Sequence, residues 1–228
     1  MQAAERIRVV DIFDEVEDDL RAERTEKLLK KYAWVLIAIV VGVIGAAAGW
    51  QLWTRYKNQQ DAAAAAQYIS LQTVLQQSAP SGPGQRAALD ALAASAPEGY
   101  KTLARLRAAG LTADAGDLTG AVTLWNAVAA DSAADPLLRD LASLLATQRQ
   151  IDKGDPVLLE ARLKPLAELG IRWAPLAEEL LAVLDLRQGR VDDARKKLQM
   201  LSMLGDAPPG LRTRAAALLA GLGTPAAK

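Results

Sequence analysis

Catalysis needs side chains that transfer protons, attack electrophiles or hold metals, and this sequence lacks the two most versatile of them. It contains no cysteine and no histidine. That removes thiolate nucleophiles, zinc–thiolate sites, disulfides and every Ser–His or Cys–His arrangement. Carboxylate, lysine, tyrosine or Ser–Lys chemistry remains, but the spacing of these residues assembles no such site. We therefore expect a protein that is not an enzyme and uses no cofactor, metal or small-molecule substrate.

Three groups of neighbouring carboxylates were the remaining candidates for acid/base or metal chemistry. They lie at residues 14–19, at Glu178 with Glu179, and at Asp192 with Asp193. The first group forms one open helix face next to Lys and Arg side chains, which makes a poor cage for a cation. The two couples are adjacent in sequence, and helical neighbours point to different sides. We interpret all three groups as solvated faces.

The composition predicts the fold class. Hydrophobic residues make up 51% of the 228 residues, yet aromatic residues make up only 4%. A chain rich in alanine and leucine and poor in aromatics favours close packing of helices over a sheet sandwich, so we expect an all-α protein. The 27 basic and 27 acidic residues balance, which argues against nucleic acid as a partner.

One uncharged segment, residues 32–54, has the length of a membrane span. No charged residue lies between Lys31 and Arg55, and 23 helical residues would extend about 34 Å, enough for a hydrocarbon core of about 30 Å. Aromatic residues flank both ends, as they do at headgroup level in membranes: Tyr32, Trp34, Trp50, Trp53 and Tyr56. A buried soluble helix and a cleaved signal peptide are the alternatives. The long charged stretch before the apolar run favours an uncleaved signal anchor.

The charges beside the span predict its orientation. Basic residues precede it at Arg21, Arg24, Lys27, Lys30 and Lys31, against Arg55 and Lys57 after it. By the positive-inside rule the N-terminus is cytoplasmic. The expected organisation is a cytoplasmic segment (residues 1–31), a transmembrane helix (32–54) and a periplasmic domain (55–228) at the inner membrane of a bacterium.

Two surfaces of the N-terminal region are candidate docking sites. Small residues at Ala38, Gly42, Gly45 and Gly49 recur at helical spacing, and such a face lets another transmembrane helix approach closely; the alternative is that Gly and Ala are simply common in such helices. In the cytoplasmic segment an apolar stripe lies above an acidic face and predicts docking on a protein partner or on the lipid of the bilayer surface, although the acidic face disfavours anionic lipid. The alternative is a solvated, frayed arm. The stripe consists of Ile12, Phe13, Val16 and Leu20.

The remainder of the chain shows a repeat. Candidate turn glycines at Gly82, Gly116, Gly154 and Gly189 are 34, 38 and 35 residues apart. Alanines flank two of them at identical offsets, whereas the middle repeat has Thr147 and Leu159 there. A period near 34 with a helix on each side of a glycine turn is typical of tetratricopeptide-type hairpins. We expect Trp125 and Trp173 to fill gaps in their core.

The pattern predicts four hairpins and a closing helix. Their expected bounds are residues 60–94, 98–130, 135–169 and 173–204, with the closing helix at 209–221. Pro136, Pro156 and Pro175 each fall near the start of an expected helix, where proline is tolerated. Stacked hairpins present an extended concave face that suits peptides or folded partners.

Three features follow one another along the chain: the acidic segment "DIFDEVEDDLRAERTEKLLKKY", one span rich in Val, Ile, Gly and Ala, and a tetratricopeptide-like domain. In this combination the chain resembles the YfgM-like family of membrane-anchored bacterial proteins. The resemblance implies a non-catalytic, ancillary role at the Sec translocon and in a periplasmic chaperone network, with a membrane partner on the small-residue face. The alternative is a structural accessory subunit of another inner-membrane complex, respiratory or of the cell envelope. An enzymatic interpretation would require activity that a single Asp, Glu, Lys or Ser change abolishes.

Overall fold

The computed structural model describes residues 12–77, 83–168 and 170–223, with side chains described from Lys31 onward except at Leu36 and Pro83. Its chain separates into two units, Met1–Asn58 and Gln59–Lys228. The described residues form nine helices and no strand, which confirms the all-α prediction.

The first unit is the greater part of helix α1 (Ile12–Gln77). Helix α1 is long because no proline interrupts it and its glycines lie within a strongly apolar stretch. The candidate span described from Lys31 has a mean hydropathy of 2.2 over its most apolar window, and none of that window is buried. Among the described residues, one helix is therefore long and apolar enough to cross a membrane.

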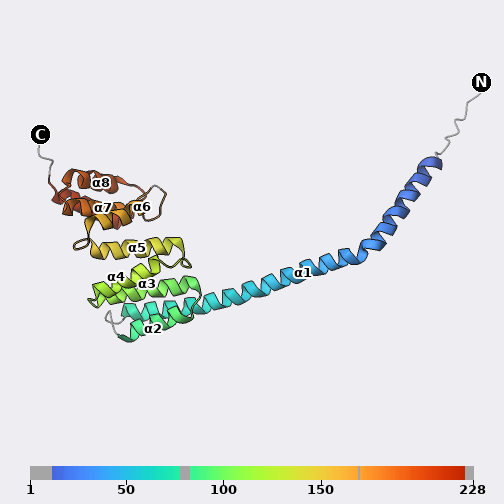
Figure 1. Cartoon of the computed structure of the whole chain (residues 1–228), viewed down its shortest axis with the longest axis horizontal. Helices are drawn as coiled ribbons and strands as arrows, with labels where there is room; N and C mark the ends of the chain where they lie inside the picture. The colour runs from blue at the N-terminus through green and yellow to red at the C-terminus, as the bar shows by residue number, and fades with distance from the viewer. Residues whose placement is uncertain (1–11, 78–82, 169, 224–228) are drawn as a thin grey trace, which may run out of the picture. The chain divides into compact units, whose positions relative to one another are not determined.

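The second unit stacks helices in sequence order, from the last five turns of α1 to the C-terminal helix (Figure 1). Its helices are α2 (Pro83–Ser95), α3 (Glu98–Asp114), α4 (Leu118–Ala129), α5 (Pro136–Gln150), α6 (Pro156–Leu166), α7 (Ala174–Arg187), α8 (Val191–Met203) and α9 (Pro209–Gly221). Prolines stand in the first turns of α5, α6 and α7, as the sequence predicted.

The core consists of four apolar clusters, each shared by three successive helices. The first joins α1, α2 and α3; the next three join α3–α5, α5–α7 and α7–α9. Trp125 is buried in the second cluster and Trp173 packs against the third, so both expectations of core packing are confirmed. Helices α3, α5 and α7 each serve two clusters, so every repeat is stabilised by its neighbours.

Two of the predicted glycine turns are nearly identical. Gly116 and Gly189 have φ of 92° and 75°, a left-handed conformation that side chains with a Cβ disfavour. In each turn the residue after the glycine donates its N–H five positions back, from Asp117 to Thr112 (3.1 Å) and from Arg190 to Asp185 (2.8 Å). This arrangement ends the first helix and reverses the chain.

Gly154 lies at a turn, as predicted, but it does not adopt the left-handed conformation of the other two glycines. Its φ is not positive, and its N–H bonds to the Gln150 carbonyl at 2.7 Å. A Cβ on Gly154 would lie 3.0 Å from that carbonyl oxygen and 3.1 Å from Leu159 Cδ1. Leu159 fills a position where the other turns have alanine, so glycine is needed here for close approach rather than for its dihedral freedom.

Hydrogen bonds also connect corresponding positions of successive hairpins, 33 to 36 residues apart. They run from Arg162 to Asn126, from Trp173 to Leu137, from Arg187 to Ile151 and Gly154, and from Arg214 to Glu179. Their separations match the period of the turn glycines, because each bond joins equivalent places in neighbouring repeats.

Candidate functional site

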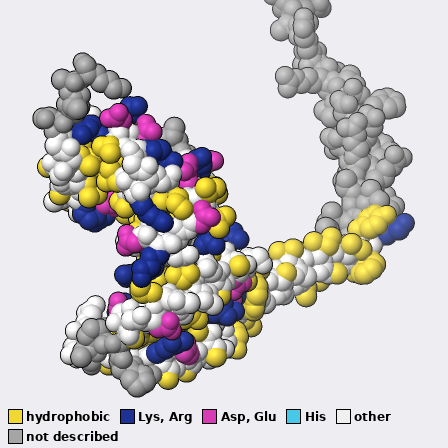
Figure 2. Space-filling view, turned by 60° about the vertical axis from the view of Figure 1, so that its left-hand side comes forward, with side chains coloured by type: hydrophobic (Ala, Val, Ile, Leu, Met, Phe, Trp, Pro, Cys, Tyr) yellow, Lys and Arg dark blue, Asp and Glu magenta, His cyan; other side chains and the backbone are white. Residues whose placement is uncertain are grey.

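The candidate span exposes large apolar side chains on all its sides. Figure 2 shows hydrophobic side chains along this stretch of α1. Ile37, Val41 and Ile44 are each more than half exposed. Because water makes such exposure unfavourable along a whole helix, the structure does not support the alternative of a buried core helix.

Aromatic and basic residues lie together at both ends of this stretch. The Lys57 ammonium lies 4.8 Å from the centre of the Trp53 ring, and the Lys31 ammonium lies 5.8 Å from that of Tyr32. The Trp50 and Trp53 rings meet edge to face at 5.9 Å. Amphipathic rings beside cations suit the two headgroup regions of a bilayer.

The predicted small-residue face is open. A Cβ added at Gly42, Gly45 or Gly49 would meet no other side chain within 4 Å. Ala38 is likewise exposed. The role of this small-residue face in helix packing therefore stays a prediction. The predicted docking stripe, Ile12, Phe13, Val16 and Leu20, belongs to α1, but its side chains lie outside the described ones.

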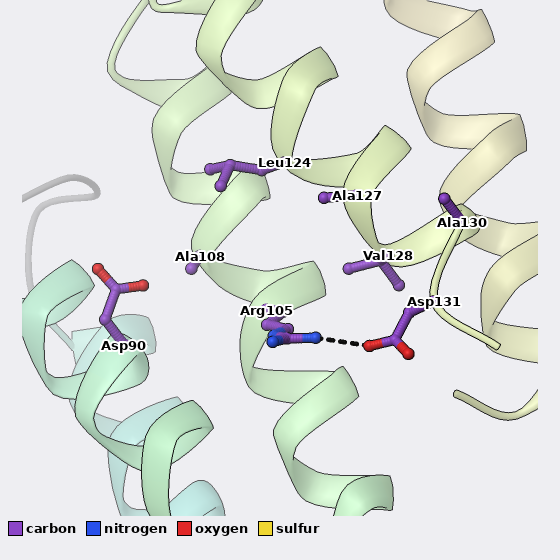
Figure 3. Close-up of a pocket in the computed structure, with 8 residues that line it drawn as sticks. All are labelled: Asp90, Arg105, Ala108, Leu124, Ala127, Val128, Ala130 and Asp131. Carbon is purple, nitrogen blue, oxygen red and sulfur yellow. Dashed lines mark hydrogen bonds and ion pairs between the residues drawn. The ribbon is translucent and has the colours of Figure 1, made fainter. Parts of the chain in front are cut away.

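A groove with a volume of about 470 Å³ crosses α3 between α2 and α4 (Figure 3). Small apolar residues line it, among them Ala108, Ala127 and Val128. Arg105 Nη1 donates to Asp131 Oδ2 at 2.8 Å. The Ala133 backbone N–H and then the Arg105 guanidinium lower the pKa of Asp131, which keeps this carboxylate ionised. The groove can accept an apolar side chain beside fixed charges.

The prediction of solvated carboxylates is wrong for Glu179. Its side chain is buried, and both of its oxygens accept hydrogen bonds from Arg214 at 2.7 and 2.6 Å. The neighbouring Glu178 is partly buried, and desolvation raises its pKa although Lys197 opposes the shift. Asp192 and Asp193 are exposed as predicted.

Asp185 is a second buried acid, and nothing in its local sequence distinguishes it from an exposed one. Its side chain is 4% exposed and lies 2.8 Å from Lys197 Nζ, while Arg190 Nε donates to it at 2.7 Å. Hydrogen bonding to Asp185 raises the pKa of Arg190, which also reaches Glu160 at 3.1 Å. Glu179 joins two repeats through Arg214, whereas Asp185 joins the two helices of one hairpin, and neither belongs to a free acid/base pair.

Neither the buried acids nor the groove was predicted, because each depends on contacts between different helices. Asp131 in the groove binds Arg105, 26 residues earlier, and Glu179 binds Arg214, 35 residues later. The repeat period was the signal that could have found Glu179, since Arg214 lies 35 positions later. Within the part of the chain that the structure describes, no group of three or more acidic residues is arranged to hold a metal ion.

Comparison with known families agrees with this architecture. The family described as "Tetratricopeptide repeat-like domain" matches residues 27–200, most of the chain. The chain belongs to this tetratricopeptide repeat-like family, whose repeats typically serve protein–protein interaction and are typically not catalytic. No curated protein and no solved structure matches the chain.

Proposed function

We propose that this chain is a non-catalytic, membrane-anchored interaction module, held by residues 32–54 and binding protein partners through its helical repeats. The observation that carries the proposal is the combination of one fully exposed apolar helix with a repeat domain of the tetratricopeptide type. A chain that anchors at one end and stacks hairpins at the other brings partners to a membrane surface.

The finer proposal concerns place and partners. The basic residues before the span support a cytoplasmic N-terminus and a periplasmic repeat domain at the bacterial inner membrane. The resemblance of residues 10–56 to YfgM-like proteins supports an ancillary role at the Sec translocon and among periplasmic chaperones. No chemistry is required for this role, in keeping with the lack of Cys and His.

The test is purification of the tagged full chain in mild detergent, with copurifying proteins quantified by mass spectrometry. Translocon subunits and periplasmic chaperones, in substoichiometric and salt-sensitive amounts, are the expected result. One complex of another kind at a fixed ratio would instead make the chain a structural accessory subunit, and the proposed translocon role would be wrong.

A further inference from the structure

Four large aliphatic side chains are exposed at the turns that join the two helices of hairpins two to four. Leu118 opens α4, Val157 and Leu158 lie in the first turn of α6, and Val191 opens α8. Val157 is 74% exposed and Leu158 63%. Their neighbours Leu159 and Leu163 already fill the core, so packing within the repeat does not explain them.

These turns form one continuous surface. A groove of about 400 Å³ has Leu118 and Thr119 on one side and Lys153 and Gly154 on the other. Arg187 at the end of α7 donates to the Ile151 and Gly154 carbonyls at 2.8 and 2.7 Å. The three turns therefore lie side by side, and we call the surface they make the turn edge.

The turn edge is acidic as well as apolar. Its exposed carboxylates are Asp114, Asp117, Asp152, Asp155, Asp192 and Asp193. Of the cations on these turns, Arg187 is bound to backbone carbonyls and Arg190 to Asp185 and Glu160. Arg149 and Lys153, which line the same groove, are exposed, and Lys196 lies 3.6 Å from Asp193. The six carboxylates outnumber these three cations, so the net charge of the turn edge is negative.

We propose that the turn edge binds a short polypeptide segment in which basic side chains alternate with large aliphatic ones. This inference rests on the proposed function as an interaction module and names the chemistry of one partner. Aliphatic side chains of the segment cover Val157 and Leu158, while its Lys or Arg side chains meet the carboxylates on either side.

The charges disfavour other occupants. An anionic lipid surface would be repelled by six carboxylates. A second copy docking by the same face would bring the same acids against each other, since a twofold interface pairs identical patches. A basic, apolar peptide satisfies both features of the surface.

The test uses the full chain in nanodiscs of zwitterionic phosphatidylcholine, with empty nanodiscs as the blank. The probes are a fluorescent 15-residue Leu/Lys peptide and a Leu/Glu peptide of the same spacing, measured by fluorescence anisotropy. The Leu/Lys peptide binds, the Leu/Glu peptide does not, and rising salt weakens binding. Hydrogen exchange slows at residues 151–158 and 187–193 when the Leu/Lys peptide is present.

Matched variants locate the site. Val157→Ser with Leu158→Ser weakens binding about tenfold, by loss of buried aliphatic area. The control, Met200→Ser with Met203→Ser, removes two aliphatic side chains of comparable exposure (51% and 74%) elsewhere on α8 and leaves binding unchanged. A second variant, Asp152→Asn with Asp193→Asn, weakens binding without touching the aliphatic residues.

Equal binding by both double-serine variants, or equal binding of the two peptides, would overturn the inference. Self-association abolished by the Val157 and Leu158 changes would assign the turn edge to a second copy. If copurification with cellular partners fails while the peptide still binds at residues 151–158, the proposed function is wrong and the peptide site stands. If partners still copurify with the Val157/Leu158 variant but no peptide binds, only the inference fails.

Discussion

Asp185 holds together the charges at the turn of the last hairpin. It is buried on α7 and receives Arg190 and Lys197 from the beginning and middle of α8. A buried carboxylate with two cations in contact is stabilising only while those cations remain, since the carboxylate alone would be a desolvated, unpaired charge.

Replacing this acid should therefore be costly. We expect Asp185→Asn to lower the free energy of unfolding by about 1–3 kcal/mol, less than for a fully buried pair because both cations are about one third exposed. Asp193→Asn is the matched control: its pair with Lys196 is exposed and 3.6 Å long, and its loss should change stability by about 0.5 kcal/mol or less. Urea unfolding monitored by circular dichroism measures both, and equal effects would contradict the structural role of Asp185.

The contribution of Glu178 to folding stability changes with pH in the opposite direction to that of most acids. Burial raises its pKa from the ordinary value of 4.5, so the folded protein binds a proton more readily than the unfolded chain does. Its contribution to stability is therefore largest below pH 4.5 and falls as the pH rises through the raised value. Glu160 and Asp131, whose pKa values are lowered, act with the opposite sign.

We expect Glu178→Gln to stabilise the protein at pH 7 and to lose that advantage in acid. The difference in unfolding free energy between the variant and the original chain isolates Glu178, because the other acids are common to both. Unfolding at a series of pH values measures it, with Asp192→Asn as the exposed control. A difference that grows as the pH falls would contradict the burial of Glu178.

At the scale of elements, the turn glycines have distinct tasks. We expect Gly189→Ala to cost about 1–2 kcal/mol, because φ is 75° there. Gly205→Ala is the control: no atom lies within 4 Å of its Cβ and its φ is not positive, so it should be neutral or slightly stabilising. Thermal unfolding compares the two, and equal shifts would show that the left-handed turn is not what requires glycine.

The small-residue face of the span gives a prediction about association. Gly45→Leu with Gly49→Leu should remove membrane partners from the purified protein while leaving insertion intact, because the larger side chains keep another helix away. Val43→Leu with Ala47→Leu changes the opposite side of the helix and should retain them. Unchanged copurification with both variants would mean that this face is not used.

Helices and repeat turns could be predicted because their signals are local and periodic. The closing helix was expected at residues 209–221 and is observed at Pro209–Gly221. Contacts between repeats were not predictable in the same way: nothing near Glu179 indicates that Arg214 will neutralise it, and Gly154 resembles its counterparts until Leu159 is packed beside it. Exposure of Val157 and Leu158 was equally hidden, because an apolar first turn normally indicates core.

At the scale of the whole molecule, the lack of cysteine makes the topology directly measurable. A single introduced cysteine would be the only thiol in the chain. We expect Thr123→Cys to react with a membrane-impermeant maleimide once the outer membrane is permeabilised, because Thr123 is exposed in the proposed periplasmic domain. Thr25→Cys should react only after the inner membrane is broken. The reverse pattern would overturn the proposed orientation.

The hydrogen bonds between corresponding positions of successive hairpins have a direction. In each of them the later residue of the pair donates and the earlier one accepts. Arg162, for example, donates to Asn126, and Arg214 donates to Glu179. For these bonds, the growing chain presents carbonyl and carboxylate oxygens, which water can solvate, before the donors that bind them exist. The closing helix reverses this order, because Arg195 on α8 donates to the Leu222 and Gly223 carbonyls. Each finished hairpin is a template for the next, so the stack can grow during synthesis without waiting for its last residue.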